Sequence, residues 1–442
     1  MTYRSTLNAA LDDLCYSLGC SFKWKIKPMK SGKAYQIKLN EDIISERYLY
    51  LVREVSFSVI EKRFIKIFFR VFNELYMDGF DVSHSLTASQ EVAVRNSVMD
   101  VTVARYLARS TRRFINVDKL LDGMKSLSFQ KYEGEQVKTI ILVFNKEYEQ
   151  LADGYDDEID DIETELVDIK KISIDNKLLS NVAFHRFVDG VSAFYIASNR
   201  LEINGYVAVR KNDYNLFQRN SSLTALSVGE NFNEYFYCVS ISSHGDVEVF
   251  REGGRLRLLY RKGKWILFDS KTLSKAIFGE DYDSSEFDAD MACKIFYSLS
   301  KIRKGAAVLC SSFRVGKLKK EREDLDNKKL FAGYISSEDV FTNLKSRIAG
   351  QSLRALADTG ELERVLMTDG LSVVDDKFKI LRDCNMIVDT SIAQIKTSSK
   401  EPDGGGRTTA VKAASFYGAA IKVSEDGPIS VYRDGRKIYS LG

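Results

Sequence analysis

Three short stretches near the end of the chain carry groups that suit the binding of a phosphorylated ligand. They occupy residues 369–371 (Asp-Gly-Leu), 404–409 (Gly-Gly-Gly-Arg-Thr-Thr) and 424–427 (Ser-Glu-Asp-Gly). Carboxylates can bind a divalent cation or accept a proton, and an arginine can hold a phosphate through two parallel hydrogen bonds. Together the three stretches supply groups that a single phosphorylated ligand can contact.

The middle stretch has the strongest physical reason to bind an anion. Gly405 and Gly406 lead into a helical run at 410–414. Backbone N–H groups at the start of a helix point outward without intrahelical partners, and the helix dipole favours negative charge there. We therefore expect Gly405, Gly406, Arg407, Thr408 and Thr409 to contact phosphates.

The elements around these stretches follow from hydrophobic pattern and turn residues. A β-rich run begins at 371, and two further strands are expected at 419–423 and 429–433. Asp434-Gly435 is a strong hairpin signal and predicts a third strand after it. Earlier, a helical face ends near Gly305, which we expect to cap the helix before a buried strand at 306–310. The pattern predicts a mixed-sheet α/β domain.

This order of elements resembles the diadenylate cyclase domain of the DisA type. That family carries Asp-Gly-Ala after a helix, Gly-Thr-Arg-His-Arg opening a helix, and Val-Ser-Glu-Glu-Thr-Gly before a hairpin. Here Leu371 replaces the alanine, and Ser424-Glu425-Asp426-Gly427 is one residue shorter than its counterpart. The resemblance covers about 285–442.

The second motif departs from the family where charge matters most. Gly406 replaces a threonine, and Thr408 and Thr409 replace the histidine and the second arginine. An arginine acting on transferred phosphate in other enzymes is worth roughly 10³–10⁵ in rate, so catalysis is more vulnerable than binding. Lys412, one turn further along, is a candidate for compensation.

The resemblance implies an enzyme that condenses two ATP molecules into a cyclic dinucleotide across a homo-oligomer, with Mg²⁺ or Mn²⁺. It implies that Asp369 and Glu425 are catalytic and bind the metal, and that Gly370, Leu371 and Ser424 join the phosphate-binding residues. The alternative is a catalytically inactive pseudo-cyclase that binds a nucleotide or cyclic dinucleotide as a sensor. Retained Asp369, Arg407 and Glu425 favour the enzyme, whereas Thr408 and Thr409 favour the sensor.

Composition limits the partners. The 65 basic and 62 acidic residues nearly cancel, which gives no reason to expect nucleic acid or an anionic membrane. No run approaches the roughly 20 apolar residues that span a bilayer. The six cysteines show no metal-binding spacing, and together these features predict a cytoplasmic protein with reduced thiols.

The rest of the chain divides into two predicted regions. Residues 1–135 have mainly helical periodicity. Residues 136–275 are β-rich, with short strands between glycine turns that indicate a meander or small barrel. This second region is sensor-like, because its position and its Gly-Lys-Trp strand resemble the N-terminal sensor module of the cyclase family. Residues 153–168 carry a dense acidic run, interpreted as a solvated connector rather than a calcium site. The predicted class is therefore α/β (α+β overall), with a cyclase-like domain at 285–442.

Overall fold

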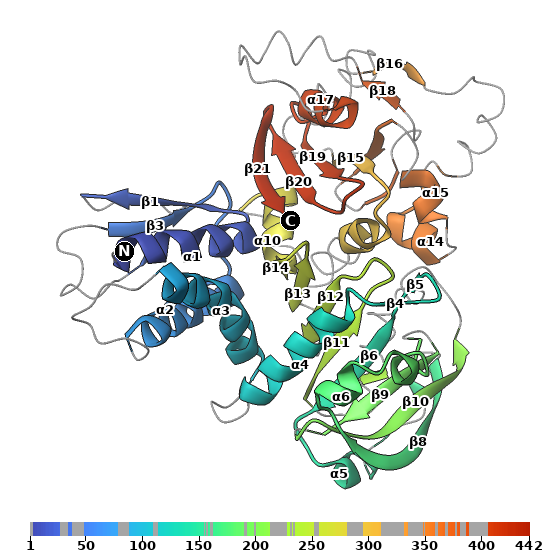
Figure 1. Ribbon diagram of the computed structural model, residues 1–442. Helices are drawn as coiled ribbons and strands as arrows, with labels where there is room; N and C mark the ends of the chain where they lie inside the picture. The colour runs from blue at the N-terminus through green and yellow to red at the C-terminus, as the bar shows by residue number, and fades with distance from the viewer. Residues whose placement is uncertain are drawn as a thin grey trace.

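The computed structural model (Figure 1) confirms the α/β class, with helices and two large sheets. It describes residues 3–26, 34–37, 48–77, 88–108, 114–153, 155, 158–159, 162–189, 192–198, 200–212, 228–229, 232, 235–251, 256–280, 295–310, 331–334, 348, 350–358, 361–366, 370–375, 378–380, 386–388 and 405–442. Within these ranges, no helix has the length and apolar character needed to span a membrane.

The N-terminal region combines helices with a small antiparallel sheet of order β1-β3-β2. Phe64, Phe68 and Phe72 recur at helical spacing and are fully buried on one face of α2, where each burial stabilises the fold by roughly 1.5–3 kcal/mol. The elements are α1 (Tyr3–Leu18), β1 (Ser21–Lys25), β2 (Ala34–Ile37), β3 (Tyr48–Val52), α2 (Val59–Met77), α3 (Ala88–Leu107) and α4 (Phe114–Leu127).

A nine-stranded sheet forms the centre of the chain, in the order β14-β13-β12-β11-β6-β9-β10-β8-β7. Strands β11 to β14 pair consecutively and antiparallel, so the predicted meander is confirmed and the barrel alternative is not. The strands are β6 (Thr139–Phe144), β7 (Glu158–Ile159), β8 (Ile162–Ser173), β9 (Ala193–Ala197), β10 (Glu202–Asn212), β11 (Phe236–Ile241), β12 (Val247–Arg251), β13 (Leu256–Arg261) and β14 (Lys264–Asp269).

Short elements accompany this sheet. Helix α10 follows β14 directly and leads toward the C-terminal region, while the others lie between the strands or before them. They are the hairpin β4 (Lys131–Tyr132) and β5 (Glu135–Gln136), and the helices α5 (Tyr148–Ala152), α6 (Asn176–Leu179), α7 (Val182–His185) and α10 (Ser270–Phe278).

The acidic run corrects one sequence expectation. Instead of a connector, most of it belongs to β7 and the twelve-residue β8, which pairs with β10. Glu163 and Glu165 alternate with the buried Thr164, and Arg210 on β10 forms an ion pair with Glu165 at 2.8 Å. Like charges are tolerated in a strand near a sheet edge when they alternate toward solvent and face basic partners.

The C-terminal region contains a five-stranded sheet in the order β17-β15-β19-β20-β21, and the predicted strands and final hairpin are confirmed. Strands β15 and β17 are parallel, and the other pairs are antiparallel. The elements are β15 (Ala306–Cys310), β16 (Phe331–Tyr334), α14 (Leu353–Asp358), α15 (Leu362–Leu366), β17 (Ser372–Val374), β18 (Met386–Val388), α17 (Gly406–Ala414), β19 (Ala419–Val423), β20 (Ile429–Arg433) and β21 (Arg436–Leu441).

Hydrophobic clusters cross both predicted domain boundaries. One cluster joins α1 to α4 with one face of the nine-stranded sheet, through residues such as Leu11, Phe64 and Leu267. A second joins β14 and α10 to the C-terminal sheet, through residues such as Phe268 and Ile421. These clusters show that the three regions pack against one another. Their division into separate domains stays a prediction.

A buried arginine lies where the three regions meet. Arg53 donates to the carbonyl oxygen of Leu18 at the end of α1 and to Glu61 Oε1 of α2 at 2.7 Å. Its guanidinium also lies 5.6 Å from the ring centre of Tyr439 on β21. Thr272 of α10 donates to Glu61 at 2.8 Å. Arg53 therefore connects helices of the N-terminal region to both remaining regions.

Removing this arginine should destabilise the whole chain. Arg53→Met leaves the fully buried Glu61 without its cation, and the loss of one partner of a buried pair costs about 3–5 kcal/mol. Arg70 is exposed on α2, the helix that carries Glu61, so Arg70→Met is the matched control and should change stability by less than about 0.5 kcal/mol. Urea denaturation measures both. Similar stabilities of the two variants would contradict the role of Arg53.

His185 predicts a pH dependence of stability. It is fully buried, its Nδ1 lies 3.2 Å from Thr139 Oγ1, and burial lowers its pKa to about 4. The unfolded chain takes up a proton below about pH 6.5 and the folded chain only below about 4, so stability falls as pH drops through this window, by roughly 3 kcal/mol in total. His185→Gln should flatten the slope measured by denaturation between pH 4 and 6.5. An unchanged slope would exclude His185 as its source.

Candidate functional site

Three strands of the C-terminal sheet bring two of the sequence motifs to one end. Val308 on β15 pairs with Ser372 on β17, and Ala306 on β15 pairs with Val423 on β19. Gly370, two residues before Ser372, therefore lies at the same end of the sheet as Ala306 and the residues that follow Val423. Asp369 lies outside the described residues, so its predicted place beside Glu425 stays a prediction.

Helix α17 brings the glycine-loop motif to this end. Val411, Ala413 and Ala414 pack into a cluster with β15 and β19, which fixes the helix on one face of the sheet. Gly405 is the N-cap residue and offers no side chain to the first-turn N–H groups, while its carbonyl accepts from the Thr408 N–H at 2.8 Å. The start of α17, with its partial positive charge, lies near the 424–427 turn.

An ion pair shows directly that two motifs meet. Nη1 of Arg407 lies 2.6 Å from Oε1 of Glu425. The Arg407 side chain is 26% exposed and that of Glu425 is 73% exposed, so the pair lies at the surface. Exposed pairs of this kind contribute about 0–1 kcal/mol, and an incoming anion can therefore replace Glu425 as the partner of Arg407 at small cost.

Gly305 has a different role from the one expected. The helical residues before it end at 302, and Arg303 takes the left-handed backbone conformation with φ of 56°, so Gly305 does not cap the helix. A Cβ atom at Gly305 would lie 2.0 Å from Nη1 of Arg407. The absence of a side chain at Gly305 leaves room for the Arg407 guanidinium to lie against the start of β15.

The structure adds a cation that sequence reasoning missed. Nζ of Lys422 on β19 donates to Oγ1 of Thr408 at 2.8 Å. Lys412, the residue proposed from sequence to compensate for the lost basic groups, lies one turn further along α17, and its charge acts on Tyr432 of β20. Burial raises the pKa of the Tyr432 hydroxyl, and the charge of Lys412 partly opposes that rise. The feature of the sequence that could have identified this cation is the lysine at 422 in an otherwise apolar strand.

The 424–427 turn is held by the nine-stranded sheet. Ser300 donates to the carbonyl of Gly427, and Arg261 of β13 donates to Ser300 at 3.4 Å. Lys262 of the β13–β14 turn forms an ion pair with Asp426 at 3.1 Å. Partial burial acts to raise the pKa of Asp426, but the hydrogen bond and charge of Lys262 outweigh it and the pKa lies below its ordinary value.

A buried polar cluster stands behind this turn. Asp246 accepts from Arg261 at 3.0 Å and from Arg303 at 2.6 Å. Glu248 of β12 accepts from Tyr297 at 2.6 Å and from Lys301 at 2.8 Å. Both carboxylates are almost fully buried and each meets a cation from the helical segment 295–302 or the residue after it. The cluster ties the nine-stranded sheet to the element that precedes β15.

The remaining predicted residues fall into two groups. Gly370, with φ of 105°, and Ser424 lie at the sheet end, and Gly405, Gly406, Thr408 and Thr409 begin α17. The Leu371 side chain is fully buried in the cluster under α17, so only its backbone is available to a ligand.

Of the two expected metal ligands, Glu425 lies within the described residues and Asp369 lies outside them. The described residues include no group of three or more His, Cys, Asp and Glu side chains placed to hold a metal ion. The exposed Glu425 carboxylate supplies the oxygen donors that Mg²⁺ and Mn²⁺ prefer, so it fits such an ion in type.

Comparison with known proteins identified no related family, so the functional assignment rests on the residues described above. A scan against protein-family models gave no match to this chain, and a search of curated proteins gave none either.

The geometry predicts unequal roles for two basic residues of α17. Arg407→Ala should weaken ATP binding about tenfold or more, because a charge-assisted hydrogen bond contributes roughly 1.5–3 kcal/mol. Lys412→Ala is the matched control on the same helix, and its affinity should stay within about twofold of wild type because Lys412 lies in the last turn of α17, beyond the glycine loop. Calorimetric titration measures both. Equal affinities of wild type and the Arg407 variant, with measurable wild-type binding, would remove this loop from the site.

Proposed function

We propose that the C-terminal region is a nucleotidyltransferase of the diadenylate cyclase type, which joins two ATP molecules into a cyclic dinucleotide. The observation that carries the proposal is the contact between Arg407 and Glu425. It unites the glycine loop and the Ser-Glu turn at the sheet end where Gly370 of the Asp-Gly-Leu motif lies. The order of the motifs supports the family, and their meeting at one sheet end supports a shared site.

The proposed chemistry assigns each residue a separate task. Backbone N–H groups of Gly405 and Gly406, the Arg407 guanidinium and the Thr408 hydroxyl hold phosphates, and Lys422 adds positive charge beside Thr408. In each half-reaction a 3′-oxygen bonds to the α-phosphorus of the other ATP, the bond to pyrophosphate breaks, and a carboxylate accepts the hydroxyl proton. Two such steps give the cyclic product and two pyrophosphates.

Asp369 and Glu425 would hold Mg²⁺ or Mn²⁺, which supplies neutralisation of phosphate charge when bound. Nη1 of Arg407 donates a hydrogen bond to Oε1 of Glu425. A triphosphate that draws Arg407 away leaves that carboxylate available. The small energy of an exposed ion pair makes the exchange compatible with ordinary ATP affinity.

The second candidate is a pseudo-cyclase that binds a nucleotide or cyclic dinucleotide without turnover. One observation favours it: the Thr408 hydroxyl receives a hydrogen bond from Lys422 instead of presenting the imidazole that the family motif carries there. A lysine and a hydroxyl can bind phosphate, but they do not reproduce a histidine and an arginine at the reacting centre.

Assembly and location follow from the proposed reaction. Two ATP molecules must face each other, so the active form is a homo-oligomer with paired sites. ATP is an intracellular substrate, and we place the protein in the cytoplasm. The meander would then act as part of a signalling sensor, with Lys262 and Arg261 contacting the 424–427 turn and its neighbour Ser300.

Incubation with ATP and Mg²⁺ or Mn²⁺, followed by mass spectrometry of products, tests the enzyme. Wild type should form a cyclic dinucleotide, and Asp369→Asn should abolish it with ATP affinity within a few fold, because the charge needed for the proton and the cation is lost. Asp434→Asn is the matched control, since Asp434 lies in the exposed final hairpin turn with φ of 51°, which Asn also tolerates.

The outcomes separate the two candidates. A wild type that binds ATP but gives no product with either metal, at any protein concentration, contradicts the enzyme and leaves the pseudo-cyclase. Product from Thr408→His/Thr409→Arg alone supports a site that has lost its catalytic donors. A wild type that binds neither ATP nor a cyclic dinucleotide contradicts both.

A further inference from the structure

Two cysteines face each other at the end of α1. The N–H of Cys20 donates to the carbonyl of Cys15 at 3.0 Å, and the N–H of Gly19 donates to that of Tyr16 at 3.4 Å, while Gly19 has φ of 60°. These are the two hydrogen bonds and the left-handed residue of a Schellman motif, which brings together the side chains at the positions of Cys15 and Cys20. Such contacts are ordinarily apolar, whereas here both members are thiols.

The two thiols are in direct contact. A hydrogen bond with Cys20, together with burial, raises the pKa of the Cys15 thiol. Cys15 is 7% exposed and Cys20 is half-buried. Both are free thiols in this structure. One buried and one accessible thiol in contact is the arrangement needed for one sulfur to be attacked from solvent and the other to resolve the product.

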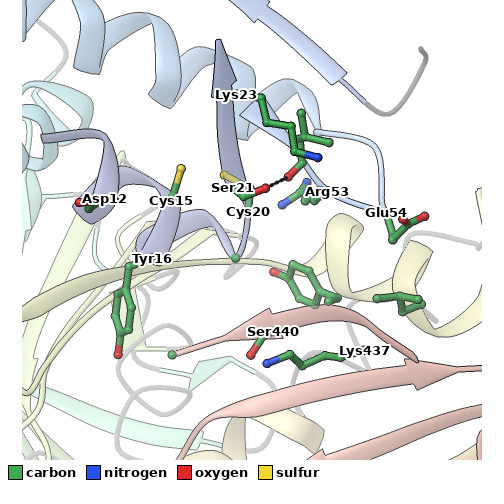
Figure 2. A pocket seen from close by; sticks show the side chains of 15 residues that line it. Asp12, Cys15, Tyr16, Cys20, Ser21, Lys23, Arg53, Glu54, Lys437 and Ser440 are labelled. Carbon is green, nitrogen blue, oxygen red and sulfur yellow. Dashed lines mark hydrogen bonds between the residues drawn. The ribbon is translucent and has the colours of Figure 1, made fainter. Parts of the chain in front are cut away.

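A cavity gives small molecules access to this pair. Its volume is about 630 Å³, and it lies between the end of α1, β1 and the final strand β21 (Figure 2). Cys15, Cys20, Lys23, Arg53 and Lys437 are among its lining residues.

We propose that Cys15 and Cys20 form a reversible dithiol–disulfide site that is oxidised by a peroxide. The Cys20 thiol loses its proton and its sulfur attacks one peroxide oxygen. The O–O bond breaks, the leaving oxygen takes that proton and departs as water or an alcohol, and Cys20 becomes a sulfenic acid. The Cys15 sulfur then attacks the Cys20 sulfur, the S–O bond breaks, and a second water leaves with the Cys15 proton. Two electrons pass from the sulfurs to the peroxide, and a dithiol reductant reverses the change.

The site borders the contact between the first and the last elements of the chain. A Cβ atom at Gly19 would lie 1.9 Å from the carbonyl oxygen of Ser440 on β21, so the motif packs directly on that strand. Drawing the sulfurs from hydrogen-bond contact to the bond length of about 2.05 Å shifts the residues around Gly19. Oxidation should therefore change how strongly the backbone amides of β21 are protected from hydrogen exchange.

Two other cysteines of the same chain serve as internal controls. Cys238 and Cys310 are buried in strands β11 and β15, with exposures of 0% and 2%. Burial raises the pKa of both thiols. Neither should react while the chain is folded, which distinguishes the proposed pair from general thiol oxidation.

Peroxide treatment of the folded, full-length protein tests the proposal. Hydrogen peroxide in small excess, alkylation of remaining thiols and peptide mass spectrometry should show a Cys15–Cys20 disulfide that dithiothreitol removes. It should form at least about tenfold faster than Cys238 or Cys310 is modified, because those thiols are inaccessible. Hydrogen exchange should change at 438–440. Cys15 and Cys20 that stay reduced, or that react no faster than the two controls, would overturn the proposal.

Single variants separate the two roles. Cys15→Ser should leave a sulfenic acid at Cys20 that a dimedone probe traps, whereas Cys20→Ser should leave Cys15 unreacted. A serine at either position keeps the size of the side chain, and circular dichroism confirms that each variant is folded. Trapping of sulfenic acid at Cys15 in the Cys20 variant would reverse the assignment of the attacking thiol and contradict the mechanism.

Discussion

The buried pair of Arg53 and Glu61 is the interaction on which the rest of the structure depends. A desolvated guanidinium must have its hydrogen-bond donors satisfied, and here the acceptors come from Leu18, Val55, Ser56 and Glu61. Glu61 in turn caps α2: its carboxylate accepts from the Ser58 N–H at 2.8 Å, and the Ser58 hydroxyl accepts from the Glu61 N–H at 3.1 Å. Thr272 of α10 donates to the same carboxylate. Glu61 therefore both caps α2 and joins α2 to α10.

The proposed site benefits from this rigidity without being part of it. Its strands belong to a sheet whose inner face is packed against β14 and α10, and the 424–427 turn rests on Ser300 and Lys262. The contact of Arg407 with Glu425 is weak and exposed by comparison. A well-packed sheet with a weak ion pair at its surface can bind a charged ligand, because the ligand replaces one partner of the pair and the surrounding strands stay folded.

The sequence predicted the features set by local pattern. Apolar period and turn residues gave β15, the meander and the final hairpin, since Asp434-Gly435 and the glycine turns near 245 and 263 act locally. Features that depend on distant partners escaped it. The acidic run looked like a connector because the pairing of β8 with β10 is not visible in the run itself, and Gly305 looked like a helix cap because Arg407 lies about a hundred residues away. Lys422 and Arg53 were missed for the same reason.

A crystal structure with a non-hydrolysable ATP analogue and Mg²⁺ tests the central claim most directly. That claim is that the glycine loop, the start of β17 and the 424–427 turn form one phosphate site. The account predicts phosphate oxygens against the first turn of α17, with the Arg407 guanidinium moved from Glu425 to a phosphate. An analogue bound elsewhere, or an Arg407–Glu425 pair that stays intact beside a bound analogue, would contradict it.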